Sequence, residues 1–296
     1  MNKNSHKAGF VSIVGKPNVG KSTLMNAMVG EKVSIITSKA QTTRHRIMGI
    51  VNDENYQIVF SDTPGIIEPK YELQKSMMRF VRFSLEDADI VLFVTDIFEK
   101  HDEEDVLERL RKIETPIYIL INKIDLAKQE ELNLKVQYWK EKVPNAVEII
   151  PVSALEKFNL DTVFNRIIEN IPLHPPYYDK DELTDKPERF FAAEIIREKI
   201  FLNYDKEIPY STEVVITDFK ETPAMISIRA QIFVERDSQK GIIIGKKGEM
   251  LKKIGTAARL EMESFFGKKV FLEQHVKVEP DWRNKDRTLK NFGYNQ

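Results

Sequence analysis

Apolar positions follow two alternating patterns along the first 171 residues. Short runs rich in Val and Ile are typical of buried strands, whereas longer stretches with an apolar residue every three or four positions are typical of amphipathic helices. The short runs predict strands near 9–14, 46–52, 55–61, 90–95, 117–122 and 147–152. The longer stretches predict helices near 21–29, 74–86, 102–113, 130–143 and 160–170.

The order of these elements predicts an α/β domain. Polar residues 52–55 separate the second and third strands and are expected to form a hairpin turn. Other consecutive strands are joined through a helix, which predicts a mostly parallel six-stranded sheet with helices on both faces. Ligands of such sheets bind at the carboxyl ends of the strands. We expect this domain to span residues 1–172.

The rest of the chain predicts a second, smaller domain. Residues 173–189 contain several prolines and acidic residues and are expected to be a linker. Residues 190–296 follow the order helix, strand, strand, helix, helix, strand, which is an α+β arrangement. The predicted elements are a helix at 190–204, strands at 212–219 and 225–234, a helix at 249–265 and a strand at 269–278. Trp282 and Leu289 are large and apolar, so we expect them to be buried.

The composition is that of a globular protein, with 42% hydrophobic and 31% charged residues. The absence of cysteine excludes disulfides and thiolate metal sites, and the five histidines lack the spacing of metal ligands. Apolar runs such as Ile90–Val94 are too short to cross a bilayer, and the N-terminus lacks a signal-peptide core. We therefore expect a cytoplasmic enzyme or binding protein.

Charge is distributed unevenly along the chain. Residues 236–296 contain 14 basic and 8 acidic residues, whereas residues 1–235 contain 31 basic and 38 acidic residues. A positively charged C-terminal part is typical of a module that binds a polyanion. Chance clustering on a solvated face is the alternative.

The segment GKPNVGKS matches the phosphate-binding loop G-x-x-x-x-G-K-[ST] and lies between a predicted strand and a predicted helix, as this loop requires. Lys21 is expected to bridge the β- and γ-phosphates, and the Ser22 hydroxyl to bind Mg²⁺. The expected nucleotide-binding residues here are Gly15, Lys16, Pro17, Asn18, Val19, Gly20, Lys21, Ser22 and Thr23. A glycine-containing turn with a surface lysine is the alternative.

Two further segments are expected near the γ-phosphate. Asp62, Thr63, Pro64 and Gly65 follow the third strand, where the carboxylate can hold Mg²⁺ and the Gly65 N–H can contact the phosphate. The polar loop 33–46 contains QTTRH, and one of its threonines is expected to bind Mg²⁺. Thr43 is the first choice and Thr42 the second.

Asn122-Lys123-Ile124-Asp125 follows the fifth strand and predicts guanine specificity. The Asp125 carboxylate can accept from the N1–H and the exocyclic amine of guanine, whereas adenine would leave it unpaired. Asn122 can brace the loop, and Lys123 can lay its stem over the base. Backbone N–H groups of Ser153 and Ala154, after the last strand, can reach guanine O6. The alternative is that Asp125 only caps a helix.

These motifs, in this order, resemble those of translation-factor-type GTPases. The segments 38–46 and 183–190 extend the resemblance to the Era family of bacterial ribosome-assembly GTPases over almost the whole chain. This resemblance implies GTP, GDP and Mg²⁺ as ligands, with Lys21, Thr43 and Gly65 in hydrolysis. It also implies binding to the 3′ end of small-subunit ribosomal RNA during small-subunit assembly, and peripheral contact with the inner membrane face; no DNA partner is expected.

A second motif lies in the basic part of the chain. The G-x-x-G element Gly245–Gly248 follows an apolar triplet at a predicted helix–helix junction and resembles the loop of a KH domain, which clamps single-stranded RNA through its backbone. Lys246 and Lys247 are expected to meet phosphates, and Ile243 and Ile244 to floor a groove for unstacked bases. An ordinary helix turn is the alternative.

The sequence departs from Ras-type GTPases, which place a glutamine after the glycine of the third motif to orient water. Ile66 and Ile67 stand there instead, and only Arg44 and Arg46 lie nearby as arginines, so we expect slow intrinsic hydrolysis. The resemblance also makes Asn18 a candidate K⁺ ligand; alternatively, it only fits the turn. An RNA-binding scaffold with a structural nucleotide site and a P-loop small-molecule kinase are the competing functions.

Overall fold

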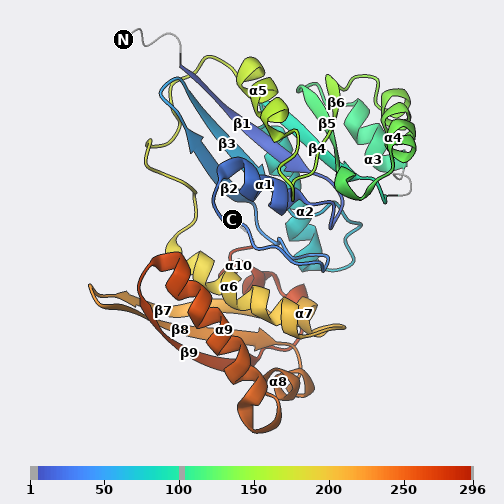
Figure 1. Ribbon diagram of the computed structural model, residues 1–296. Coiled ribbons are helices and arrows are strands. Elements are labelled where there is room, and N and C mark those ends of the chain that lie inside the picture. Colours follow the sequence, from blue (N-terminus) through green and yellow to red (C-terminus); the bar gives the residue numbers. More distant parts are fainter. Residues whose placement is uncertain (1–5, 100–103, 295–296) are drawn as a thin grey trace. The chain divides into compact units, whose positions relative to one another are not determined.

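The computed structural model describes residues 6–99 and 104–294 (Figure 1). The chain forms two compact units. The first consists of residues 1–34, 43–68 and 77–185, and the second of residues 35–42, 69–76 and 186–296. Two short segments from the N-terminal half of the chain, 35–42 and 69–76, therefore belong to the C-terminal unit.

The first unit is built on a six-stranded sheet with strand order β2-β3-β1-β4-β5-β6, in which only β2 is antiparallel to its neighbour. The elements of this part of the chain are β1 (Lys7–Val14), α1 (Lys21–Val29), β2 (Ile47–Asn52), β3 (Tyr56–Asp62), α2 (Glu72–Glu86), β4 (Ile90–Asp96), α3 (Glu104–Arg111), β5 (Ile117–Asn122), α4 (Gln129–Lys142), β6 (Glu148–Pro151) and α5 (Leu160–Asn170). The predicted helix at 102–113 is thus present as α3, and its first two predicted residues lie outside the described residues.

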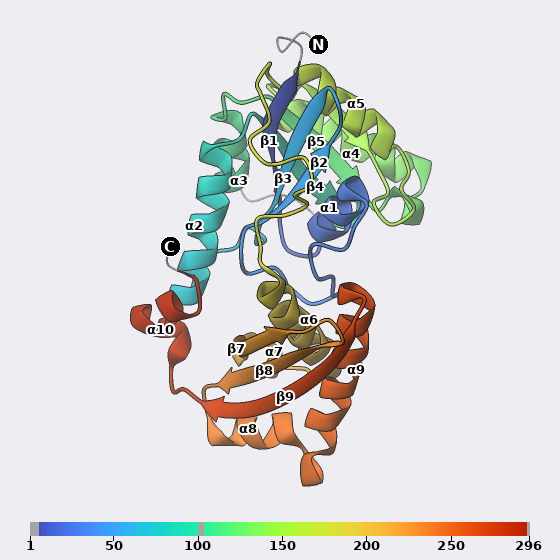
Figure 2. The same cartoon turned by 90° about the vertical axis from the view of Figure 1, so that its left-hand side faces the viewer.

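Helices cover both faces of this sheet, as predicted. Val81 of α2, Leu107 of α3 and Trp139 of α4 belong to one buried cluster on the sheet. α1 and α5 cover the other face (Figures 1 and 2). Every residue of β4 and β5 is buried, which explains why these strands read as continuous apolar runs rather than as alternating ones.

Residues 173–185, which make up most of the expected linker 173–189, lie along the β2 side of the sheet. The Ile50 N–H donates to the Leu183 carbonyl (2.8 Å), and Thr184 forms an isolated bridge with Gly49. The Gln57 amide oxygen accepts from the N–H groups of residues 177 and 178. This stretch pairs the backbone of an otherwise open edge strand, and the first unit therefore continues to Asp185.

The second unit has a three-stranded sheet of order β7-β8-β9, antiparallel between β7 and β8 and parallel between β8 and β9. Its helices and strands are α6 (Glu188–Asn203), α7 (Ile208–Ser211), β7 (Glu213–Glu221), β8 (Met225–Val234), α8 (Asp237–Ile244), α9 (Glu249–Phe266), β9 (Lys269–Val278) and α10 (Asp286–Asn291). α6 and α9 cover one face of the sheet (Figure 1), where Ile196, Ile228 and Ile254 share one core.

The tail packs back on the second unit. Trp282 and Leu289 are fully buried, as expected, and the Trp282 indole N–H donates to the Ser211 carbonyl (2.9 Å). The Tyr294 hydroxyl donates to the Glu213 carboxylate (2.6 Å). Within residues 6–99 and 104–294, no helix has the length and apolar character needed to cross a bilayer.

Candidate functional site

The first candidate site lies at the carboxyl ends of β1, β3, β4, β5 and β6, where the loops after these strands contact one another. The loop between β1 and α1 holds the phosphate-binding motif. Gly20 has φ +97°, and a Cβ there would lie 2.3 Å from the Asn122 side-chain nitrogen. A side chain at position 20 would therefore collide with the loop that follows β5, so both motifs depend on this glycine.

Lys21 begins α1, and its side chain is buried. Its ammonium donates to the Lys16 carbonyl (2.7 Å). Burial lowers the pKa of Lys21 to about 8, against the opposing effect of the Asp62 and Glu99 carboxylates. A buried ammonium at a helix N-terminus, beside a loop of backbone N–H groups, is well placed to bind an anion.

Three side-chain oxygens meet beside this lysine. The Ser22 hydroxyl donates to one oxygen of Asp62 (2.6 Å), and the Thr43 hydroxyl lies 2.9 Å from the Ser22 hydroxyl. Asp62 is fully buried, and its other oxygen, Oδ1, has no hydrogen-bond partner among the described residues. Burial raises the pKa of this carboxyl. Such a cluster of hard oxygen donors fits Mg²⁺.

Their hydrogen bonds distinguish the two threonines that the sequence offered as Mg²⁺ ligands. The Thr42 hydroxyl donates to the Lys39 carbonyl (2.7 Å) and lies 2.5 Å from the Thr37 hydroxyl. Thr42 thus bonds within its own loop, whereas Thr43 reaches Ser22. Of the two, only Thr43 has its hydroxyl in the oxygen cluster.

The loop after β3 lies directly on the phosphate-binding loop. A Cβ at Gly65 would lie 2.7 Å from the backbone nitrogen of Pro17, so only glycine permits this approach. The Ile66 N–H donates to the Gly15 carbonyl (3.0 Å), and the Thr63 hydroxyl donates to the Ile13 carbonyl (2.8 Å) at the end of β1. Pro64 lies in the chain between Thr63 and Gly65, which make these contacts.

The loops after β5 and β6 join the same cluster. The Asn122 amide donates to the Val19 carbonyl (2.8 Å) and accepts from the Ala154 N–H (2.9 Å). The Ser153 hydroxyl donates to the Asp125 carboxylate (2.6 Å). One asparagine therefore ties the predicted base-recognition loop to both the phosphate-binding loop and the Ser153-Ala154 loop.

Two acidic residues at the carboxyl end of β4 belong to this site, although the sequence analysis did not single them out: Asp96 is the last residue of the strand and Glu99 follows it. The Lys123 ammonium donates to the Asp96 carboxylate (2.6 Å) and to the Asn18 carbonyl (2.7 Å). Lys16 forms an ion pair with Glu99 (3.0 Å). The available signal was their position, because both lie at the carboxyl end of a strand of the same parallel sheet.

The hydrogen bonds of Arg46 go to residues outside the phosphate-binding loop. The Arg46 guanidinium makes two bonds to Asp87 (2.6 and 3.0 Å) and one to Ser61 (2.9 Å). Arg44 is almost fully buried. Slow intrinsic hydrolysis stays a prediction.

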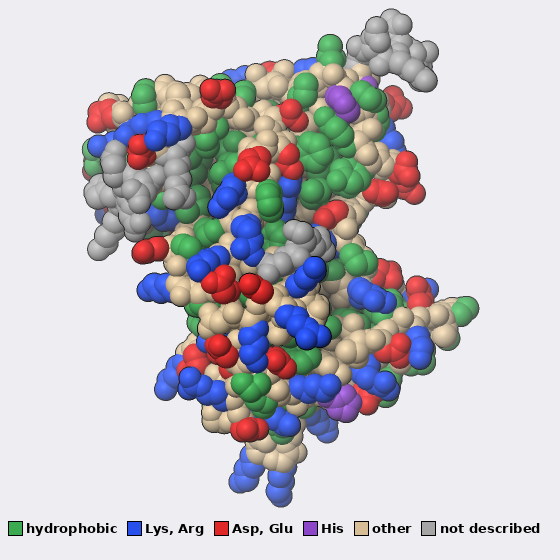
Figure 3. Space-filling view, turned by 180° about the vertical axis from the view of Figure 1, so that it is seen from behind, with side chains coloured by type: hydrophobic (Ala, Val, Ile, Leu, Met, Phe, Trp, Pro, Cys, Tyr) green, Lys and Arg blue, Asp and Glu red, His purple; other side chains and the backbone are tan. Residues whose placement is uncertain are grey.

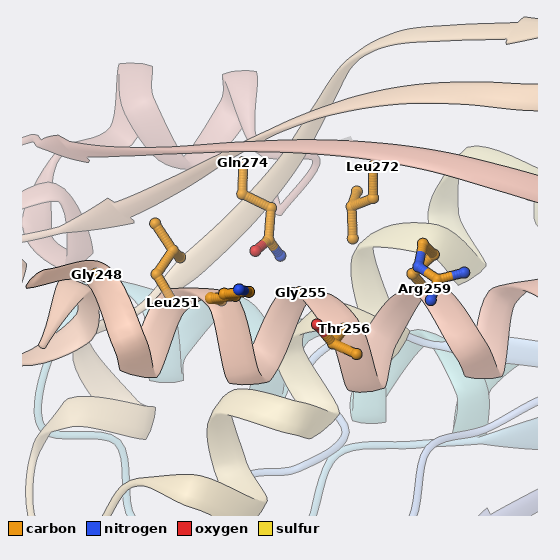
Figure 4. Close-up of a pocket in the computed structure, with 8 residues that line it drawn as sticks. Gly248, Leu251, Gly255, Thr256, Arg259, Leu272 and Gln274 are labelled. Carbon is orange, nitrogen blue, oxygen red and sulfur yellow. The ribbon is translucent and has the colours of Figure 1, made fainter.

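The second candidate site is a groove of about 360 Å³ in the second unit, between α9 and β9 (Figure 4). Its lining residues are Gly248, Leu251, Lys252, Gly255, Thr256, Arg259, Leu272 and Gln274. The Gln274 side chain extends from β9 toward α9, and a Cβ at Gly255 would lie 2.6 Å from its oxygen. The Gln274 amide nitrogen is buried, and no described residue accepts its hydrogen bonds.

The G-x-x-G element borders this groove through Gly248. It forms the turn between α8 and α9, with φ +71° at Gly245 and +79° at Gly248, and Lys246 and Lys247 are exposed on it. In the space-filling view, Lys and Arg side chains gather on a protruding tip of this unit (Figure 3).

In the apolar triplet before this turn, Ile243 does not lie in a groove for bases, as the sequence analysis predicted. Ile243 is fully buried in the core of the second unit, and its carbonyl accepts from the Tyr204 hydroxyl (2.7 Å). Ile244 is half-buried. The helical turn of α8 directs Ile243 inward, and it does not line the groove; Leu251 and Leu272 supply the apolar lining instead.

Comparison with known families agrees with this architecture. A family model described as "50S ribosome-binding GTPase" matches residues 10–123, and a KH-domain model matches residues 207–283. Together with the sheet order and the two sites, these matches define a P-loop GTPase domain followed by a KH domain. The predicted fold class is therefore confirmed.

Relatives that match over almost their whole length identify the family within this class of GTPases. GTPase Era of Ruminiclostridium cellulolyticum is 43% identical over 293 residues (98% of each chain), and that of Alkaliphilus metalliredigens is 46% identical over 294 residues (98% and 99%). A solved structure of Era in complex with MgGDPNP and nucleotides 1506–1542 of 16S ribosomal RNA is 43% identical, covers 98% of this chain and 100% of its own, and has a TM-score of 0.94. The chain belongs to the Era family of GTPases.

Proposed function

We propose that the protein binds GTP and Mg²⁺ in the cluster at the strand ends and uses GTP hydrolysis to control binding to small-subunit ribosomal RNA. The main supporting observation is that four side chains lie close together next to the loop that contains Gly65. These are Lys21, Ser22, Asp62 and Thr43. Lys21 would hold the β- and γ-phosphates, and the three oxygens would hold Mg²⁺, which supplies charge neutralisation.

Guanine recognition is assigned to the loops after β5 and β6. Ser153 already holds the Asp125 carboxylate by one oxygen, which fixes its orientation for the two donors on the guanine edge. The Ala154 N–H donates to the Asn122 side-chain oxygen, so its proposed contact with guanine O6 would require that bond to be shared or exchanged when the base binds. The Lys123 stem, anchored by Asp96, would cover the base.

Hydrolysis is proposed to be slow without an activator. Ile66 and Ile67 cannot orient water through their side chains, and Arg46 is held by Asp87. A missing arginine finger costs roughly 10³–10⁵ in rate. K⁺ bound by Asn18 is part of the proposal, and equal turnover in K⁺ and Na⁺ buffers would remove it.

RNA binding is assigned to the groove between α9 and β9. Lys246, Lys247 and Lys252 would contact phosphates, while the unpaired Gln274 amide and the apolar groove wall would receive unstacked bases. The Era complex with 16S ribosomal RNA supports the 3′ region of this RNA as the ligand, because that chain matches this one throughout. The "50S" wording belongs to a model that matches only residues 10–123.

The test is GTP turnover with and without an oligonucleotide from the 3′ end of 16S ribosomal RNA. We expect slow basal turnover and a several-fold increase with this RNA, but not with an oligonucleotide of scrambled sequence. Asp125→Asn serves as the variant control and should lose the preference for GTP over ATP. Equal binding of GTP and ATP by the native protein would contradict the assignment of the base site. The absence of phosphate release even with RNA would favour the scaffold alternative.

The cellular location is also a proposal. A protein that assembles the small subunit would act in the cytoplasm, where that subunit is made. The peripheral membrane contact implied by the family resemblance would then be secondary, and cell fractionation with the ribosomal subunits resolved would distinguish the two pools.

A further inference from the structure

A buried serine next to the cluster of oxygen donors has no role in the function proposed above. Ser34 is 2% exposed, and its hydroxyl oxygen has no hydrogen-bond partner within residues 6–99 and 104–294. A buried hydroxyl without a partner costs free energy, so such groups are rare in folded proteins. The position of Ser34 therefore requires an explanation.

The backbone of Ser34 is held in place by one asparagine. The Asn26 side-chain oxygen accepts from the N–H groups of Val33 (3.0 Å) and Ser34 (2.9 Å), and its nitrogen donates to the Ser34 carbonyl (2.7 Å). Asn26 lies four residues after Ser22 in α1, so both side chains lie on the same face of this helix. The helix that supplies a proposed Mg²⁺ ligand thus also fixes Ser34.

The Ser34 hydroxyl lies next to the Asp62 carboxylate. Burial raises the pKa of Asp62, and the Ser34 hydroxyl is among the groups that oppose this rise. The hydroxyl is not aligned for a hydrogen bond, and Asp62 Oδ1 is likewise buried without a partner among the described residues. Ser22 already donates to the other oxygen, Oδ2 (2.6 Å). A donor and an acceptor that both lack partners are therefore neighbours in the interior of the first unit.

We infer that Ser34 is a positioning residue for Asp62 in the Mg²⁺-bound protein. Rotation of its hydroxyl allows a hydrogen bond to Oδ1, while Ser22 keeps its bond to Oδ2 and has lone pairs left for the cation. A carboxylate that is held at both oxygens has a fixed orientation, and groups that orient metal ligands in this way raise metal affinity. The inference rests on the proposed Mg²⁺ site.

The alternative is that Ser34 is a small buried residue that matters only for packing. Alanine, which lacks only the hydroxyl, would then serve equally well. The hydrogen bonds to Asn26 would persist in Ser34→Ala, because they engage the backbone of residue 34 and not its side chain. This substitution therefore removes the hydroxyl and leaves the loop in place.

The experiment measures binding of fluorescently labelled GDP to the native protein and to Ser34→Ala over a range of Mg²⁺ concentrations. We expect the Mg²⁺ concentration for half-maximal tightening to rise about tenfold to a hundredfold in the variant. Affinity in the presence of a chelator should stay unchanged, because the phosphate-binding loop and the guanine loops are intact. Ser34→Thr, which keeps a hydroxyl, should need less Mg²⁺ than Ser34→Val, which has the same shape without it.

Ser84→Ala is the matched control for the loss of a buried hydroxyl. Ser84 is fully buried in the same unit, and its hydroxyl bonds to Ser12 rather than to a proposed Mg²⁺ ligand. Its Mg²⁺ requirement should equal that of the native protein. A native-like requirement in folded Ser34→Ala, or an equal rise in Ser84→Ala, would overturn the inference. If the native protein itself binds GDP equally with and without Mg²⁺, the proposed Mg²⁺ site is refuted, and the inference with it.

Discussion

At the scale of single residues, the nucleotide site contains two buried groups of opposite charge, the Lys21 ammonium and the Asp62 carboxylate. Burial lowers the pKa of Lys21 to about 8 and raises that of Asp62. Each shift has the same main cause, because removal from water disfavours the charged form. A bound triphosphate and a divalent cation supply the compensating charges, so binding is expected to restore both charged forms.

This reasoning predicts proton uptake on nucleotide binding. In the protein alone at pH 9, Lys21 with a pKa of about 8 is mostly neutral, and a bound triphosphate should return it to the ammonium form. The uptake should approach ~0.9 proton at pH 9 and stay near ~0.1 at pH 7. Calorimetry of GDPNP binding in buffers of different ionisation enthalpy measures it at each pH. Equal uptake at both pH values would contradict the lowered pKa.

The sign for stability follows from the same shift. The folded-state pKa of Lys21 lies below the unfolded value of 10.5, so the unfolded chain binds more protons between about pH 8 and 10.5. The contribution of this residue to the stability of the protein alone therefore increases as pH rises through that window. Bound nucleotide should abolish this increase.

At the scale of elements, both sites lie at junctions between regular structures. The G-x-x-G turn joins α8 to α9 and borders the groove with Gly248, where the chain has positive φ and open space for an added Cβ. At Gly245, by contrast, an added Cβ would lie 2.7 Å from the Met250 side chain. A side chain added at Gly248 would therefore cause only backbone strain, whereas one added at Gly245 would also collide with Met250.

We predict that Gly245→Asp combined with Gly248→Asp abolishes RNA binding while the fold survives. The aspartates would place negative charge where phosphates approach and block the close approach of the backbone. Gly248→Asp alone should lower RNA affinity by about tenfold or more at constant salt, with about 1–2 kcal/mol of backbone strain. Filter binding and thermal unfolding measure the two effects.

The matched control is Gly241→Asp. It adds the same charge in α8 at an exposed glycine with no atom within 4 Å of the added Cβ and no positive φ. RNA affinity should change little. An equal loss in the control and in Gly248→Asp would show that general charge, rather than the turn, determines binding.

At the scale of the whole molecule, the two compact units do not follow the order of the chain. Residues 173–185 bind along the sheet of the first unit, and residues 35–42 and 69–76 belong to the second. In the latter, the Tyr71 hydroxyl donates to Gln41 (3.2 Å), and the Arg283 guanidinium lies 4.9 Å from the Tyr71 ring centre. No single position in the sequence therefore separates the two compact units.

This arrangement predicts that a fragment of residues 1–185 is more stable than one of residues 1–172. The shorter fragment loses the backbone bond of Ile50 and the contacts of Gln57, and it exposes the edge strand β2 to self-association. At about 0.5–1.5 kcal/mol for each bond, the difference should be roughly 2–4 kcal/mol. Urea unfolding with GDP present measures it, and equal midpoints would show that 173–185 is only a linker.

Much of the fold could be read from the sequence. All predicted strands and helices are present, with ends within about two residues of those observed, because their apolar periodicity reflects burial on one or both faces. α7 was not predicted as a helix, since such a short turn carries little periodic signal. The boundary region 173–185 could not be placed, because its partners Gly49, Ile50 and Gln57 lie more than a hundred residues away.

The amino-acid sequence by itself determined the architecture, the family and the motifs for phosphate and guanine, because each motif acts through a few consecutive residues whose backbone shape is local. Only the tertiary structure decided which threonine reaches Ser22, that Asp96 and Glu99 support the loops, that Ile243 turns inward, and that Ser34 lies beside Asp62. These features arise from packing between distant segments, and local patterns carry no record of such contacts.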